Sequence, residues 1–121
     1  MPHEDIANFL PLSPAAFHVM VSLADGSRHG YAIIKDVAER TGGAERLGAG
    51  TLYAIIKRLL SDNLITETSS TERDPGGDQR RRYYRRTALG RKVATAEAER
   101  LERAVASARS SRLLPTPSAA R

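Results

Sequence analysis

The stretch from Gly48 to Leu64 has the clearest pattern of hydrophobic and polar positions in the chain. Its apolar residues recur with the spacing of one helix face. They are Leu52, Ile55, Ile56, Leu59 and Leu60. The opposite face carries Thr51, Tyr53, Lys57 and Arg58. We therefore expect a helix that docks on a core through one face. Its other face either enters the major groove of DNA or, as on an ordinary surface helix, lies in solvent.

A first helix is predicted over about residues 14 to 24. Ser13-Pro14 supplies a cap followed by proline at the first helical position. The expected inner face is Phe17, Met20, Val21 and Ala24, in a stripe widened by Val19 and Leu23. So wide a stripe indicates burial on two sides, against the body and against a partner subunit. Phe17 and Val21 are the candidates for contact with that partner.

A second helix is predicted over about residues 30 to 41, ending at Gly42-Gly43. Its expected buried face is Ile33, Ile34, Val37 and Ala38. Together with the helix that starts near Gly48, it forms a helix-turn-helix. Residues 1–13 are expected to be a short arm from which Phe9, Leu10 and Leu12 pack on the body. Pro11 and Pro14 either keep this arm non-helical or end it.

The pattern changes after Asn63. Residues 64–68 form a short β-prone run, residues 74–77 give a strong turn signal, and residues 80–87 form a second strand rich in Arg and Tyr. These two strands predict a hairpin with a long, flexible, cationic tip. Three helices followed by such a hairpin define a winged helix-turn-helix, and we expect this DNA-binding domain over residues 14–87. The expected fold class is mostly α with a small β-hairpin.

Thr87 is expected to cap a final helix over about residues 88 to 112. From Ala98 onward its apolar residues are three or four positions apart, which resembles a coiled-coil seam. The seam residues proposed to form a dimer are Leu101, Val105 and Ala108. The alternative is a solvated helix stabilised by alanine and mixed charges. Residues 113–121, with two prolines, are expected to be a disordered tail.

The composition limits the kind of protein. The chain has 121 residues and no cysteine, which indicates one domain without a disulfide framework or thiolate site. No signal-peptide pattern and no membrane-span pattern occurs, so a cytoplasmic, soluble protein without membrane contact is expected. His3, His18 and His29 lack metal-binding spacing, and no catalytic motif appears. We therefore expect neither an enzyme nor a metal or cofactor.

The positive charge is concentrated in one part of the chain. The net charge is +5, and residues 57–92 contain ten Lys or Arg against five Asp or Glu. Residues 79–92 contain seven cations and no acid. A neutral body with one basic patch indicates a polyanionic partner, and double-stranded DNA is the expected one.

Each candidate DNA-binding residue has a simpler alternative role. Thr51 and Tyr53 lie near a helix N-terminus, which favours phosphate, although Tyr53 can instead pack on the wing. Lys57 is the better phosphate candidate than Arg58, which turns toward the wing, and both can simply be solvated. Tyr31 is a further candidate, although packing explains its presence as well. The last candidates are Arg80, Arg81 and Arg82, which are expected to contact the minor groove or the DNA backbone. Their alternative role is to keep an edge strand soluble.

Three stretches of the sequence resemble the PadR family of transcriptional regulators. They are LPLSPAAFHVMVSLADGSRHGYAI at 10–33, GAGTLYAIIKRLLSDNLI at 48–65 and RRRYYRRTALGRKV at 80–93. The resemblance implies a homodimer that binds a near-palindromic operator, usually as a repressor. In some members a small aromatic or drug-like effector releases the DNA, and the resemblance places such a ligand between the first helix and the partner's last helix.

The sequence departs from the family pattern at three points. Ala49 replaces a frequent proline, Arg86 replaces a leucine, and tryptophan is absent, so an aromatic sandwich built on tryptophan is not available. Arg86 shares a strand face with Tyr84, so it must either extend out of the core or reach a phosphate. A second functional class stays open, in which the winged helix is a protein-interaction module and its basic wing meets an acidic partner.

Overall fold

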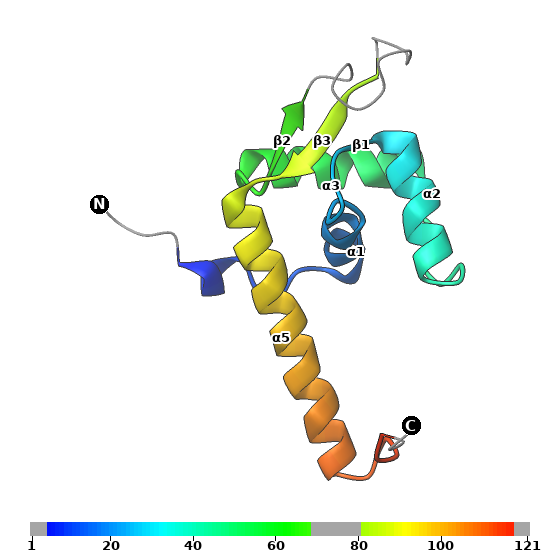
Figure 1. Cartoon of the computed structure of the whole chain (residues 1–121), viewed down its shortest axis with the longest axis vertical. Helices are drawn as coiled ribbons and strands as arrows, with labels where there is room; N and C mark the ends of the chain where they lie inside the picture. Colours follow the sequence, from blue (N-terminus) through cyan, green and yellow to red (C-terminus); the bar gives the residue numbers. More distant parts are fainter. Residues whose placement is uncertain (1–4, 69–80, 118–121) are drawn as a thin grey trace.

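The computed structural model describes residues 5–68 and 81–117, and it combines a helical body, a small sheet and one long C-terminal helix (Figure 1). The elements are the 3-10 helix η1 (Ile6–Phe9), α1 (Pro14–Ser22), β1 (Arg28–His29), α2 (Gly30–Arg40), α3 (Ala49–Ser61), β2 (Ile65–Thr68), β3 (Tyr83–Arg86) and α5 (Ala88–Ser110). The far half of α5 extends away from the rest of the molecule, on the side opposite the hairpin (Figure 1). This arrangement is the expected mostly α fold with a small sheet.

Side-chain caps and left-handed residues set the helix ends. The Ser13 hydroxyl accepts a hydrogen bond from the Ala16 amide at 3.1 Å, with Pro14 at the first helical position. Gly42 and Gly43 have φ of 62° and 88° where α2 ends. Asn63 has φ of 61° after α3, a conformation that asparagine tolerates better than most residues. The caps and stops expected from the sequence are therefore confirmed.

The sheet has three antiparallel strands in the order β1-β3-β2. Ile65 pairs with Arg86 and Thr68 with Tyr83 across the expected hairpin. The sequence analysis missed β1, whose two residues pair Arg28 with Tyr84 and His29 with Tyr83. A strand of two residues has no period, so its existence follows only from the tertiary pairing.

The core is formed where α1, α2, α3, the sheet and the first turns of α5 meet. Its fully buried apolar side chains are Val19, Met20, Leu23, Ile33, Val37, Leu52, Ile56, Leu59, Leu64 and Val93. The inner face predicted for α1 is partly wrong. Val19, Met20 and Leu23 are buried, whereas Phe17 and Val21 are half-buried and Ala24 is exposed. The reason is that α1 packs on both α2 and α5, which turns it away from the face that periodicity favoured.

The N-terminal arm is attached to α5 by a buried carboxylate. Glu97 is 1% exposed, accepts a hydrogen bond from the Leu12 amide at 3.3 Å and receives the Arg100 guanidinium at 2.7 Å. The Arg100 hydrogen bond holds the pKa of Glu97 below its ordinary value, although burial opposes this. Within the arm, Asp5 caps the short helix η1 by accepting from the Ala7 amide, and η1 ends before Pro11.

The C-terminal helix ends at Ser110, two residues before the expected boundary. Thr87 caps its start, with its hydroxyl oxygen accepting from the Gly90 amide at 2.9 Å. Residues 113–117 form neither helix nor strand, and the Arg109 guanidinium donates to the Pro115 carbonyl at 3.0 Å. No helix within the described ranges is long and apolar enough to cross a membrane.

Candidate nucleic-acid interface

The outer face of α3 is the first part of the candidate interface. Leu52, Ile56 and Leu59 bury the inner face of this helix. Thr51, Tyr53, Lys57 and Arg58 are all exposed on the other side, with Tyr53 54% exposed. Arg58 is paired with Asp62, with 3.2 Å between Nε and the carboxylate, which lowers the charge that it offers to a ligand. Lys57 has no such acidic partner among the ion pairs of the described residues, and its preference over Arg58 as a phosphate contact stays a prediction.

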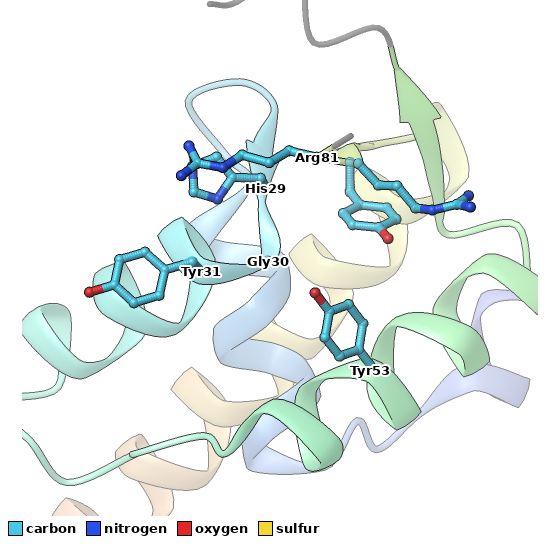
Figure 2. Close-up of a pocket in the computed structure, with 7 residues that line it drawn as sticks. His29, Gly30, Tyr31, Tyr53 and Arg81 are labelled. Carbon is cyan, nitrogen blue, oxygen red and sulfur yellow. The ribbon is translucent and has the colours of Figure 1, made fainter. Parts of the chain in front are cut away.

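A cleft of about 500 Å³ lies between the N-terminus of α2, the outer face of α3 and the hairpin (Figure 2). Its lining residues are His29, Gly30, Tyr31, Tyr53, Arg81, Arg82 and Tyr84. The structure thus brings together four of the predicted site residues, from α2, from α3 and from the segment just before β3. Thr51, Lys57 and Arg58 do not line the cleft, and Arg80 lies outside the described residues.

Two arginines of the wing, just before β3, point in different directions. The Arg81 side chain extends over the start of α2, where its Nη1 lies 3.2 Å from Nε2 of His29 (Figure 2). Arg82 turns to the neighbouring strand and pairs with Glu67 at 3.1 Å. Both guanidinium groups stay exposed, so each is accessible to a ligand that approaches the cleft. Arg82, however, must leave or share Glu67 to bind an anion.

Tyrosine hydroxyls occupy the floor and rim of the cleft. The Tyr53 hydroxyl lies over Gly30, where an added Cβ would be 3.0 Å from it. Burial, followed by the Glu67 carboxylate, raises the pKa of Tyr84, so its hydroxyl stays protonated as a possible donor. Tyr31 is 69% exposed at the rim. The cleft therefore offers tyrosine hydroxyl groups beside two cations, a combination suited to phosphate oxygens.

Three lining residues were missed as site residues in the sequence. His29 and Gly30 precede the predicted Tyr31, and the signal that marks them is the pairing of β1 with the wing, which only the fold reveals. Tyr84 was expected in the core, and its ring is indeed buried while it also lines the cleft. Of the two positions expected for Arg86, the structure shows the one outside the core. Its Nη2 donates to the Ala24 carbonyl at 3.5 Å, near the end of α1. It extends out of the core toward a helix end, within a separate pocket that also contains Arg85 and Arg91.

The predicted dimer residues fall on two elements. Leu101 and Val105 are 37% and 39% exposed on α5, while Ala108, Phe17 and Val21 are half-buried. Phe17 and Leu101 also line a second cavity, of about 690 Å³, between the arm, α1 and α5. The other lining residues are Pro11, Leu12, Ser13, Pro14, His18, Glu97 and Arg100. This largely apolar surface lies far along α5 from the cleft.

The fold and the basic cleft place the protein among winged-helix DNA-binding regulators. Residues 19–96 match the Transcriptional regulator PadR-like family. That match spans most of the chain, from α1 into α5, and the chain belongs to this family of transcription regulators. Membership assigns the protein to a class that acts by binding DNA, as the sequence motifs indicated.

Two solved structures of PadR family regulators are similar to the chain, and so is one curated protein of uncharacterised function. A PadR family transcription regulator from hypervirulent Clostridium difficile is 30% identical, with a TM-score of 0.68, covering 81% of this chain and 97% of that one. A PadR family regulator from Eggerthella lenta is 26% identical, with a TM-score of 0.61 and coverages of 92% and 87%. An uncharacterised protein of Lysinibacillus sphaericus is 32% identical over 57% of this chain. The match spans 61% of that relative's length.

Proposed function

We propose that this protein is a homodimeric repressor that binds a near-palindromic DNA operator. The observation that carries the proposal is the single face on which the outer side of α3, Tyr31 and the wing residues Arg81 and Arg82 meet. In this proposal α3 enters the major groove, and the wing follows the backbone or the adjacent minor groove. Bound at a promoter, such a dimer blocks access to the DNA beneath it.

The side chains of this face divide into two tasks. Lys57, Arg81 and Arg82 contact phosphates and set the position of the protein, together with the amide groups at the start of α3. Thr51 and Tyr53, near the N-terminus of α3, are the candidates for reading base edges or lying against a phosphate. Arg58 is also proposed to contact a phosphate, although its pair with Asp62 weakens this contact. Arg80 is included because it is next to Arg81 in the sequence.

The dimer in this proposal forms through α5 and the exposed side of α1. Leu101 and Val105 are large apolar side chains on a helix that the described part of the chain leaves largely uncovered. A second copy of α5 supplies the matching surface, with Phe17, Val21 and Ala108 joining the contact. Two-fold symmetry then sets the two recognition helices about one turn of DNA apart.

The resemblance to the PadR family adds a small-molecule effector to the proposal. The cavity beside Phe17 and Leu101 has about 690 Å³ of space and a mainly apolar lining, which suits a small aromatic or drug-like compound. Because this cavity borders the proposed dimer contact, a ligand there changes the spacing of the two recognition helices. The effector is thus expected to act on DNA affinity without touching the cleft.

A selection from random double-stranded DNA tests the proposed function. The protein is incubated with a duplex library, bound molecules are recovered, and the enriched sequences are aligned. The proposal predicts an inverted repeat whose halves are about 10 base pairs apart, centre to centre. Enrichment of a single half-site contradicts the dimeric reading. Absence of any enriched sequence contradicts specific DNA recognition and leaves the basic wing to an acidic protein partner.

A further inference from the structure

A basic pocket lies at the root of the wing, where β3 runs directly into α5 (Figure 1). It has a volume of about 320 Å³ between the turn after α1, the end of β3 and the first turn of α5. The lining of this arginine pocket includes Gly26, Arg85, Arg86, Ala88 and Arg91. The pocket shares no lining residue with the cleft, and none of its lining comes from α2 or α3. A molecule bound here therefore occupies a site of its own.

Three arginines supply the charge of the arginine pocket. Arg85 and Arg86 end β3, and Arg91 lies about one turn into the helix that follows, so the chain itself brings the three together. Arg85 and Arg91 are exposed, and Arg86 is half-buried. The Arg86 guanidinium donates to the Ala24 carbonyl at 3.5 Å, which uses only one of its N–H groups. Most of the donors of these side chains are therefore available to a ligand.

Within the described part of the chain, no carboxylate neutralises this charge. The lining contains no Asp or Glu, and no ion pair between described residues includes Arg85, Arg86 or Arg91. Asp25 is adjacent in sequence to the lining residue Gly26, but it does not line the pocket, and its carboxylate lies 3.3 Å from Nη2 of Arg40. Like charges around one pocket repel each other, so an anion bound among them is stabilised.

The number of arginines indicates which anion matches the pocket. A guanidinium binds phosphate through two parallel N–H donors, a geometry that lysine cannot offer. One phosphate group carries about −1.5 to −2 charges near pH 7, so two linked phosphates match three arginines. The start of α5 at Ala88 adds a partial positive charge. The volume of about 320 Å³ suits a small anion better than a large ligand.

We propose that the arginine pocket binds a small molecule that carries a diphosphate group. Arg85, Arg86 and Arg91 donate to the phosphate oxygens, and the ligand bridges the end of β3 and the start of α5. This inference goes beyond the proposed function and does not depend on it, because the pocket and the cleft have no lining residue in common. Inorganic pyrophosphate is the smallest probe of the site.

Isothermal titration calorimetry of the full chain with pyrophosphate, at constant ionic strength, measures this binding. We expect one pyrophosphate per chain, bound at least about tenfold more tightly than inorganic phosphate, because the second phosphate adds charge-assisted hydrogen bonds. Arg85→Gln and Arg91→Gln should each weaken pyrophosphate binding about tenfold. Both side chains are exposed, so neither substitution disturbs the core. Arg103→Gln, at an exposed site further along α5, is the matched control and should bind as the wild type does.

Two glycine amides report where the pyrophosphate binds. Gly26 lines the arginine pocket and Gly30 lines the cleft, so a ¹H–¹⁵N correlation spectrum distinguishes the two sites. During the titration the Gly26 signal should shift with the affinity found by calorimetry, while the Gly30 signal stays in place. In the Arg91→Gln protein the Gly26 shift should need about ten times more pyrophosphate. Unchanged signals elsewhere in that spectrum show that the variant keeps its fold.

Three results would overturn the inference. The first is a wild-type protein that binds no pyrophosphate, or an Arg91→Gln protein that binds it as tightly as the wild type. The second is a shift of Gly30 without a shift of Gly26, which would place the anion in the cleft. The third is a loss of operator affinity in Arg91→Gln, without pyrophosphate, that exceeds the loss in Arg103→Gln. The pocket would then hold a phosphate of the DNA backbone.

Failure of this inference and failure of the proposed function remain distinguishable. A protein that selects no operator contradicts the repressor proposal, whereas the pyrophosphate titration requires no DNA and still decides whether the arginine pocket binds a diphosphate. A protein that selects an operator but does not bind pyrophosphate contradicts only the arginine pocket.

Discussion

Gly90 determines how closely the last helix approaches the body of the protein. A Cβ built on this residue would overlap the carbonyl oxygen of Leu64 and lie 2.8 Å from its carbon and 3.0 Å from Cε of Met20. The same carbonyl accepts a hydrogen bond from the Thr87 amide at 3.1 Å. The backbone of α5 therefore rests directly on Leu64, in the turn between α3 and β2, and on Met20 of the core.

Gly90→Ala is therefore expected to destabilise the fold by about 3 kcal/mol, because a rigid backbone group must move to admit one methyl group. Urea unfolding followed by circular dichroism measures the change. Gly50→Ala is the control, since an added Cβ there meets nothing within 4 Å. Gly50→Ala should leave the free energy of unfolding unchanged or raise it by up to about 1 kcal/mol, because alanine favours a helix more than glycine does. Equal effects of the two substitutions would contradict the close approach at Gly90.

Glu67 holds Arg82 in the protein without DNA. The pair is exposed, with 3.1 Å between its charged groups, so it contributes little to stability. We expect Glu67→Gln to tighten operator binding about threefold, since Arg82 is released and an acid is removed near the phosphates. Fluorescence anisotropy measures the affinity, and Glu99→Gln, an exposed acid on α5, controls for net charge. Weaker binding by Glu67→Gln would mean that the carboxylate helps to orient Arg82 for DNA.

Some single-residue roles could be predicted from the sequence and others could not. Ser13 and Thr87 were identifiable as caps, because capping depends on local sequence. Glu97 was not identifiable as buried, since its partner Leu12 is 85 positions away and glutamate on a long helix is normally solvated. The same applies to His29, whose contact with Arg81 spans 52 positions.

Among the elements, the contact between the arm and α5 depends on one carboxylate. The pKa of Glu97 is lowered from its ordinary value of 4.5, first by the Arg100 hydrogen bond and then by the Leu12 amide, against the effect of burial. A carboxyl group whose pKa is lower in the folded state than in the unfolded state stabilises the fold at pH values above its unfolded pKa. That contribution is lost as the pH falls through the folded pKa.

Glu97→Gln should therefore destabilise the protein more at pH 7 than at pH 3. The wild type loses the ionised contact in acid, so the free energies of unfolding of the two proteins should be closer at pH 3 than at pH 7. Unfolding free energies in urea at the two pH values give the comparison. Glu102→Gln, which removes an exposed carboxylate from the same helix, should show a smaller pH-dependent difference. A Glu97→Gln effect that is the same at both pH values would contradict the ionised contact.

Periodicity predicted the helices well and the small elements poorly. The face of α3 followed from its apolar spacing, because one side of that helix packs on the core and the other is exposed. For α1 the spacing was misleading, since two neighbouring helices cover it and no single stripe describes its burial. η1 and β1 are too short for any pattern, and both depend on tertiary contacts.

For the molecule as a whole, the proposed dimer links the two ends of the structure. The elements that line the cleft lie at one end of the molecule, and the far half of α5 extends from the other (Figure 1). We expect Leu101→Asp to give a monomer in sedimentation velocity and to weaken operator binding at least about tenfold, because two half-sites are no longer engaged together. Arg103→Asp, at an exposed position away from the seam, should remain dimeric. A dimeric Leu101→Asp protein with full affinity would contradict the seam on α5.

A fluorescence-anisotropy titration of the wild-type protein tests whether it recognises a specific DNA sequence. The selected operator and a scrambled duplex of equal length and composition are each titrated at several salt concentrations. We expect much tighter binding to the operator, with the logarithm of the affinity falling steeply with the logarithm of the salt concentration. Equal affinity for the two duplexes, or no binding to either at low salt, would contradict a specific DNA-binding regulator.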